Sequence, residues 1–263
     1  MPVIFMITGF FIGSFLGVIV DRITKNKTIV KGRSCCDECK KKLIWKDLVP
    51  IFSFLLIKGK CRYCKTSLSP FYPIIEFITG VCFLISAQFI FSKHQSAIEI
   101  YNLKFMMDLI FYLYIVSVLI IIFFIDLKYG IIPDKILFPA VLITLIFNIL
   151  NSYDQILNMF FSAIGASLFF LFLILITKGK GMGYGDVKFV FLIGLLLGFP
   201  NIVFSLYLAF LTGGIVSIIL ILCRRKKFQK DTIPFGPFLS FSTFLCLFWG
   251  DLIIKTALRL LNL

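Results

Sequence analysis

Long runs of apolar residues constrain this chain more than any other feature. Several of them approach the ~20 residues that an α-helix needs to cross the hydrocarbon core of a bilayer. Hydrophobic residues make up 60% of the chain and charged residues only 15%, so the sequence is far more apolar than that of an average globular protein. We therefore predict an all-α polytopic membrane protein with about eight transmembrane helices.

The predicted spans can be placed on the sequence to within a few residues at either end. The sixth is short, because the turn Gly198–Asn201 contains Gly and Pro, which would stop a helix before the seventh span begins. The first span lacks the basic start and small-residue cleavage site of a secretory signal, so we expect it to be retained. The expected spans are about 3–20, 72–92, 107–126, 136–151, 156–177, 187–199, 201–223 and 235–252.

The basic residues predict how these spans are oriented. If the spans alternate in direction, all but four of the 27 lysines and arginines fall on one side, and the four exceptions are Lys93, Lys104, Lys255 and Arg259. Because loops rich in Lys and Arg stay in the cytoplasm, we expect both termini outside. The net charge of +14 is then explained by topology and by contacts with the lipid bilayer, and we expect no nucleic-acid partner. The sequence predicts no particular oligomeric state.

The segment 21–71 is the only stretch long and polar enough for a soluble subdomain, which we expect in the cytoplasm between a first helix at 1–20 and a seven-helix membrane core at 72–263. A core of about fifty residues is marginally stable without a covalent or metal cross-link. Disulfides are not expected in the cytoplasm, and the Cys-x-x-Cys pairs of this segment are typical of a structural Zn²⁺ site with four thiolate ligands. The expected ligands are Cys36, Cys39, Cys61 and Cys64.

Cys35 leaves the first metal ligand open. It could replace Cys36 with one extra intervening residue, although the spacing to Cys39 favours Cys36. Four thiolates would close the coordination shell of the metal, so we expect no chemistry at the zinc.

Two acidic residues at matching depths form the candidate catalytic site. Asp186 lies in a glycine-rich turn, Gly181–Lys188, between two apolar runs, and Asp126 ends another apolar run. Gly183 and Gly185 would let the backbone and a substrate approach closely, and Lys188 completes the turn. Two carboxylates that share one proton can serve together as base and acid in peptide hydrolysis, so the two roles are not assigned separately.

Each acid also has a structural interpretation. Asp126 could be a solvated carboxylate at a helix end, and Asp186 could cap the sixth helix, as we expect Asp134 to cap the fourth. Glu76 is a possible cavity acid near the start of the second span, whereas solvation at the membrane interface is expected for Asp108.

Several other chemistries lack their required residues. His94 is the only histidine of the chain and falls in a loop on the outside. Histidine-dependent serine hydrolysis and HExxH metalloproteolysis therefore lack their base or their metal ligands. The glycine-rich turn does not continue into the Lys-Ser/Thr pattern of a phosphate-binding loop.

In these features the chain resembles the type IV prepilin peptidases, which are membrane aspartic proteases with a Gly-x-Gly-Asp motif. The resemblance covers nearly the whole chain. It is carried by Gly13–Leu16 with Arg22, the two Cys-x-x-Cys pairs, Pro70–Glu76, Asp126 with Ile132–Asp134, Gly181–Lys188 and Pro234–Leu239.

The resemblance implies that Asp126 and Asp186 are the catalytic pair and that 72–263 is the peptidase core. It implies prepilin or pseudopilin substrates, whose short basic leader is cut at the cytoplasmic face of the bacterial inner membrane. Relatives with the cysteine-bearing loop also methylate the new N-terminus with S-adenosylmethionine, which the sequence itself does not indicate. Which pilin is cut stays open.

Two other functions stay open at this point. One is a non-enzymatic membrane scaffold or small transporter whose zinc loop docks a partner. The other is a methyltransferase with a vestigial protease.

Overall fold

A computed structural model describes residues 2–24, 35–36, 38–42, 44–94, 103–151, 153–179, 181–223 and 233–260. The chain folds into two compact units, Met1–Ile121 and Ile122–Leu263, and the boundary between them lies within a helix. The prediction of a 1–20, 21–71 and 72–263 division concerns function and stays a prediction.

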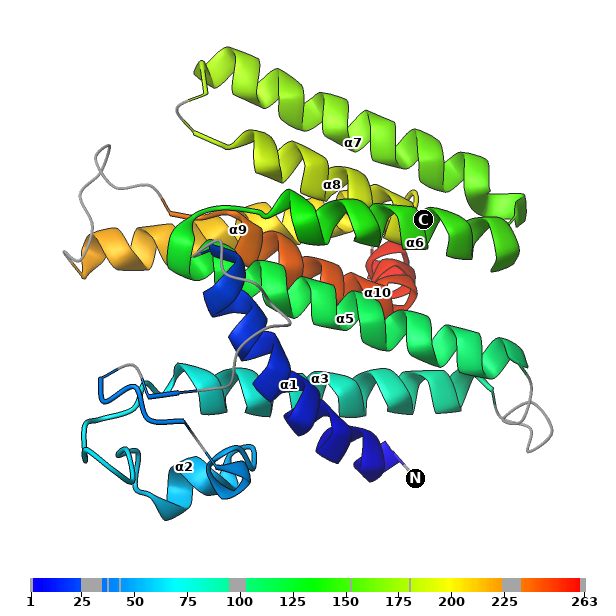
Figure 1. The fold of residues 1–263 in the computed structure, drawn as a ribbon. Helices are drawn as coiled ribbons and strands as arrows, with labels where there is room; N and C mark the ends of the chain where they lie inside the picture. Colours follow the sequence, from blue (N-terminus) through cyan, green and yellow to red (C-terminus); the bar gives the residue numbers. More distant parts are fainter. Residues whose placement is uncertain are drawn as a thin grey trace. The chain divides into compact units, whose positions relative to one another are not determined.

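Every predicted span is a helix in the structure, and seven helices in the described part of the chain are long and apolar enough to cross a membrane. The predicted span that is too short for this is α8, Tyr184–Leu197, with 14 residues. The all-α polytopic fold is therefore confirmed. The seven helices, coloured along the chain in Figure 1, are α1 (Pro2–Thr24), α3 (Phe71–Lys93), α5 (Leu103–Tyr129), α6 (Asp134–Asn151), α7 (Ile156–Thr177), α9 (Asn201–Leu222) and α10 (Gly236–Leu260).

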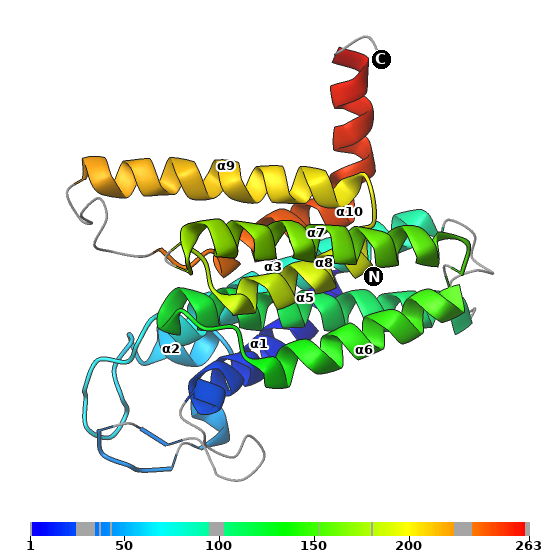
Figure 2. The same cartoon turned by 90° about the horizontal axis from the view of Figure 1, so that it is seen from above.

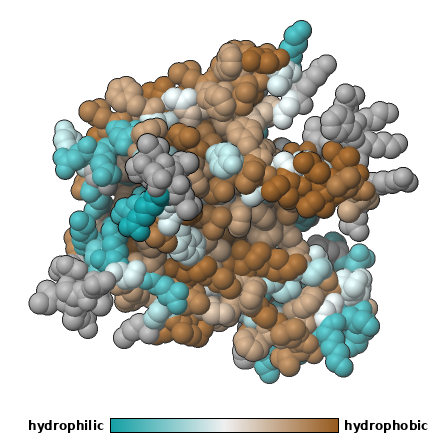
Figure 3. All heavy atoms as spheres, turned by 180° about the vertical axis from the view of Figure 1, so that it is seen from behind, coloured by the Kyte–Doolittle hydropathy of each residue, from teal (hydrophilic) through white to brown (hydrophobic). Residues whose placement is uncertain are grey.

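The exposed surface of these helices is suited to lipid. In the space-filling view of Figure 3, hydrophobic residues form broad brown areas over the helices, and hydrophilic residues collect in smaller teal patches. Large apolar side chains such as Leu142, Phe161 and Leu175 are more than half exposed. Water would not solvate such a surface well, but a bilayer would.

The first unit is built on the close packing of α1 against α3, which cross in Figure 1. A Cβ on Gly9 would lie 2.7 Å from the Cα of Gly80, and a Cβ on Gly13 would lie 2.7 Å from the Cα of Glu76. Small residues let helix backbones approach closely in membranes, where van der Waals contact drives helix association.

The polar segment between α1 and α3 contains a short 3-10 helix, Trp45–Asp47, and the five-residue helix α2, Phe52–Leu56. Two short turns carry the Cys-x-x-Cys pairs, and each turn is closed by an isolated β-bridge. An ion pair of 2.9 Å between Asp47 and Arg62 joins the 3-10 helix to the second of these turns.

The second unit is organised around α8, which lies between α6 and α7 in Figures 1 and 2. The helix also contacts α9 and α10. Its backbone approaches α7 closely, because a Cβ on Gly194 would lie 2.3 Å from the Cα of Ala163. Asn148 of α6 donates its side-chain N–H to the carbonyl of Leu195 at 2.8 Å, which satisfies a carbonyl in the last turn of α8.

Candidate active site and metal centre

Asp126 lies in the last turn of α5 and is only 5% exposed. Its Oδ2 accepts a hydrogen bond of 2.8 Å from the backbone N–H of Gly236, the first residue of α10. The first N–H groups of a helix have no partner within the helix and attract negative charge. The start of α10 therefore fixes the carboxylate of Asp126 in position.

Asp186 is the third residue of α8 and is 8% exposed. Its Oδ2 accepts a hydrogen bond of 3.0 Å from the backbone N–H of Gly183, just before the helix. Gly185 allows the first turn of α8 to approach Ile132, whose Cβ would lie 3.2 Å from a Cβ at this position. The glycines of the motif thus bring the start of α8 against the loop that follows α5.

The structure brings Asp126 and Asp186 together, close enough for their charges to interact. Both carboxylates are buried, and each is held through Oδ2 by a glycine N–H. Like charges in a poorly solvated place repel each other, which favours a state in which only one of the two carboxyl groups is ionised. The pair can therefore remove a proton from one group while giving a proton to another.

Lys188 forms an ion pair that joins two helices. Its Nζ lies 2.9 Å from both carboxylate oxygens of Asp134, the first residue of α6, and 5.6 Å from the centre of the Phe138 ring. Both charged side chains are about half exposed, so the pair contributes ~1 kcal/mol at most to stability. Its main effect is to set the position of α8 against α6.

The thiols of Cys36, Cys39, Cys61 and Cys64 form a cluster in which all four sulfurs lie within 4.8 Å of one another. The Sγ atoms of Cys36 and Cys64 are 3.8 Å apart. Zinc–sulfur bonds of ~2.3 Å in a tetrahedron place two sulfurs ~3.8 Å apart. The cluster can therefore hold a tetrahedral metal ion, and Cys35 lies outside it, exposed and bridged to Lys42.

Each pair of cysteines is presented by the same kind of turn. In one, the N–H of Lys40 donates to the carbonyl of Cys36 at 3.0 Å, and in the other, the N–H of Lys65 donates to the carbonyl of Cys61 at 3.0 Å. Both lysines have positive φ, 55° and 61°. Hydrogen bonds from the side chain and then the backbone of Thr66 lower the pKa of the Cys64 thiol to about 6.

Glu76, the possible cavity acid, lies in the first unit and is 7% exposed. Its Oε2 accepts a hydrogen bond of 2.7 Å from the backbone N–H of Ile51, and Ser14 of α1 also bonds to it. The carboxylate thus connects α1, α3 and the start of α2.

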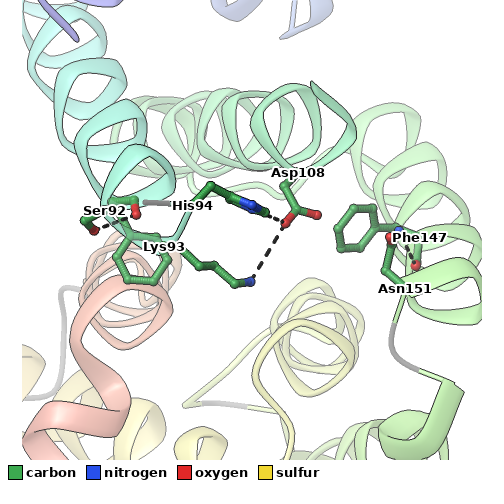
Figure 4. Close-up of polar contacts among 7 residues, drawn as sticks. Ser92, Lys93, His94, Asp108, Phe147 and Asn151 are labelled. Atoms are coloured by element: carbon green, nitrogen blue, oxygen red, sulfur yellow. Dashed lines mark hydrogen bonds and ion pairs between the residues drawn. The ribbon is translucent and has the colours of Figure 1, made fainter. Parts of the chain in front are cut away.

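Asp108, for which solvation was expected, is buried instead, with 3% exposure. Figure 4 shows the reason: His94, at the end of α3, bonds through Nε2 to Oδ2 of Asp108 at 3.2 Å, and Lys93 lies 3.9 Å away. The His94 ring also meets Phe105 edge-on at 5.5 Å. His94 therefore joins the end of α3 to the start of α5 rather than lying free in a loop.

Sequence reasoning did not find Gly236 as part of the site. It lies in the segment Pro234–Leu239, which carries the resemblance to the family but predicts no role for this glycine. Pro in the first turn is typical of the start of a helix, but nothing in the sequence connects that start to Asp126 across 110 residues.

Two family models match this chain. The family model of the Bacterial Peptidase A24 N-terminal domain matches residues 7–90, and that of the Type IV leader peptidase family matches residues 113–218. No solved structure matches the chain.

Three relatives share the name prepilin leader peptidase/N-methyltransferase. The protein of Aeromonas hydrophila is 31% identical over 85% of this chain and 73% of its own length. That of Aeromonas salmonicida is 29% identical over 93% and 89%, and that of Bacillus subtilis is 29% identical over 98% of each chain. These matches do not favour a scaffold or transporter, and they show that the chain belongs to the type IV leader peptidase family.

Proposed function

We propose that Asp126 and Asp186 are the catalytic pair of a membrane aspartic endopeptidase that cuts the short basic leader from prepilins or pseudopilins. The observation that carries the proposal is the pair of buried, interacting carboxylates at the end of α5 and the start of α8. The names of the relatives supply the substrate class. Membership in the peptidase family supports the reaction type.

The pair acts on a water molecule placed between the two carboxyl groups. The ionised carboxylate takes a proton from the water as its oxygen attacks the carbonyl carbon of the scissile bond. The protonated carboxylic acid gives its proton to the carbonyl oxygen, which forms a tetrahedral intermediate. The carboxyl group that took the proton of the water then gives it to the amide nitrogen as the C–N bond breaks, and the other carboxylate takes a proton from a hydroxyl of the intermediate. The N–H groups of Gly236 and Gly183 hold the Oδ2 atoms of the pair, and as far as the described residues go this leaves the Oδ1 atoms for the water.

Substitution of either acid tests this mechanism. We expect Asp126→Asn and Asp186→Asn each to lower the rate of leader removal at least ~100-fold, because general acid–base catalysis contributes that much. The measurement is cleavage of a purified prepilin by the full-length protein in lipid. Asp154→Asn, at an exposed position of the 3-10 helix Tyr153–Gln155, is the matched control and should cleave normally. Normal cleavage by an Asp126 or Asp186 variant would remove that residue from the mechanism.

We further propose that Cys36, Cys39, Cys61 and Cys64 hold one structural Zn²⁺. Elemental analysis of protein purified without chelators should find one zinc per chain, and Cys39→Ser or Cys61→Ser should abolish it. Cys35→Ser should keep the zinc, because Cys35 lies outside the cluster. Loss of zinc from Cys35→Ser together with retention of zinc by Cys36→Ser would show that Cys35, and not Cys36, is the ligand. In so small a subdomain, metal binding supplies much of the folding free energy.

The names of the relatives also support methylation of the new N-terminal amine. S-adenosylmethionine would supply the methyl group in that reaction. Transfer of labelled methyl groups to a pre-cleaved and to an uncleaved prepilin is the test. Transfer to the pre-cleaved prepilin is expected at once, and transfer to the uncleaved prepilin only after its leader is removed, because only cleavage creates the amine. Transfer without any cleavage activity would support a methyltransferase with a vestigial protease.

A further inference from the structure

The five-residue helix α2 presents an apolar face that its own subdomain does not cover. Phe52, Leu55 and Leu56 are 63%, 64% and 81% exposed. Their spacing places them on one side of the helix. Phe54 faces the other way, because its ring lies 3.1 Å from where a Cβ on Gly59 would stand. The helix is therefore amphipathic, with one face inside the subdomain and one face outside.

The charged residues that flank α2 in the sequence are mainly basic. Lys46, Lys58 and Lys60 are exposed. The nearby acid Asp47 is already engaged, since it is paired with Arg62 and its side chain is only 4% exposed. An apolar face bordered by lysines is typical of a helix that lies in the interface of a membrane with anionic lipids.

The hydrogen bond from Ile51 to Glu76 fixes the depth at which α2 begins. Glu76 lies five residues inside α3, or ~8 Å from the first residue of that helix. Ser14, which also bonds to Glu76, lies ten residues, or ~15 Å, before the end of α1. Both distances place Ile51 beside the membrane-spanning part of α1 and α3 rather than beyond its polar end. Phe52, the first residue of the apolar face of α2, directly follows Ile51 in the sequence.

We propose that α2 lies in the membrane interface, with Phe52, Leu55 and Leu56 among the lipid acyl chains and Lys46 and Lys58 at anionic headgroups. Lipid fits better than a protein partner, because the depth of Ile51 brings the face to the bilayer whether or not another protein is present. The cysteine cluster is in the same subdomain as α2. Insertion of α2 would therefore keep the metal site at the membrane surface.

Photo-crosslinking on the full-length protein tests the proposal. Benzoylphenylalanine is introduced in place of Leu56, and the protein is reconstituted in nanodiscs that contain phosphatidylglycerol. After illumination, mass spectrometry should find adducts to phospholipid at this position. The matched control is the same probe in place of Phe54, which faces the inside of the subdomain and should yield several-fold less lipid adduct.

A charge variant separates lipid contact from mere proximity to the disc. Lys58→Glu should lower the lipid adduct at position 56 in anionic nanodiscs and leave it unchanged in nanodiscs of neutral lipid. Adducts of the Leu56 probe to a second copy, to another part of the chain or to an added prepilin, in place of lipid, would overturn the proposal. So would an equal lipid yield from the two probe positions.

Discussion

Gly236 shows how a single residue can fix the chemistry of a distant one. Its N–H holds Asp126 across 110 residues of sequence, and its missing side chain is equally important. A Cβ at this position would lie 2.6 Å from Oδ2 of Asp126, which is inside van der Waals contact. The residue positions the acid through its backbone and makes room for it.

We therefore expect Gly236→Ala to lower the rate of leader removal by ~10- to 100-fold, because a displaced hydrogen bond to a charged group costs ~1.5–3 kcal/mol. Leader removal by the full-length protein, at saturating and at low prepilin concentration, is the measurement. Gly214→Ala in α9 is the control, since a Cβ there meets nothing within 4 Å. Unchanged cleavage by Gly236→Ala would show that the contact is not needed.

The sequence singles out the acids and the cysteines that the structure brings together, but it does not predict the residues around them. Asp126, Asp186 and the four clustered cysteines are recognisable because few residue types do such chemistry at such spacing. The burial of Asp108 was missed, because its partner His94 lies beyond the end of the preceding span. Side-chain pairs between helices depend on tertiary packing, which the local pattern of residues does not contain.

The positions of the long helices could be predicted from the sequence more directly than the side-chain contacts. Each long apolar run became a helix, because an unpaired backbone polar group in lipid costs several kcal/mol. The helix α2 was not predicted, since five residues are too few to show a helical period. The central place of α8 could not be read from its sequence either, although its shortness was expected from the turn at Gly198–Asn201.

Contact between α7 and α8 depends on one glycine. Gly194→Ala would drive a Cβ into the backbone of Ala163, so we expect a loss of stability of ~1–3 kcal/mol from overpacking and reduced leader removal. Gly165→Ala, on the exposed side of α7 where a Cβ meets nothing within 4 Å, should instead gain ~0.5–1 kcal/mol. Thermal unfolding of the purified protein in detergent measures both. Equal midpoints for the two variants would contradict the close contact.

For the whole molecule, the chain is a multi-pass membrane protein, and the charge pattern predicts its orientation. We expect both termini outside and the metal and acid sites at the cytoplasmic face, because nearly all lysines and arginines lie in loops on that side. Alkaline phosphatase fused after Leu263 should be active, since it folds only outside. The same reporter fused after Lys135 is the control and should be inactive. The opposite pattern would invert the topology.

Helix α8 is 14 residues long, or ~21 Å, against a hydrocarbon core of ~30 Å. A helix of that length is too short to cross the hydrocarbon core, and its contacts with α6, α7, α9 and α10 hold it in place. The depth of Asp186 in the membrane is then set by these longer helices and not by the fit of α8 to the bilayer. Membranes of different thickness should therefore leave the position of the cut in the substrate unchanged.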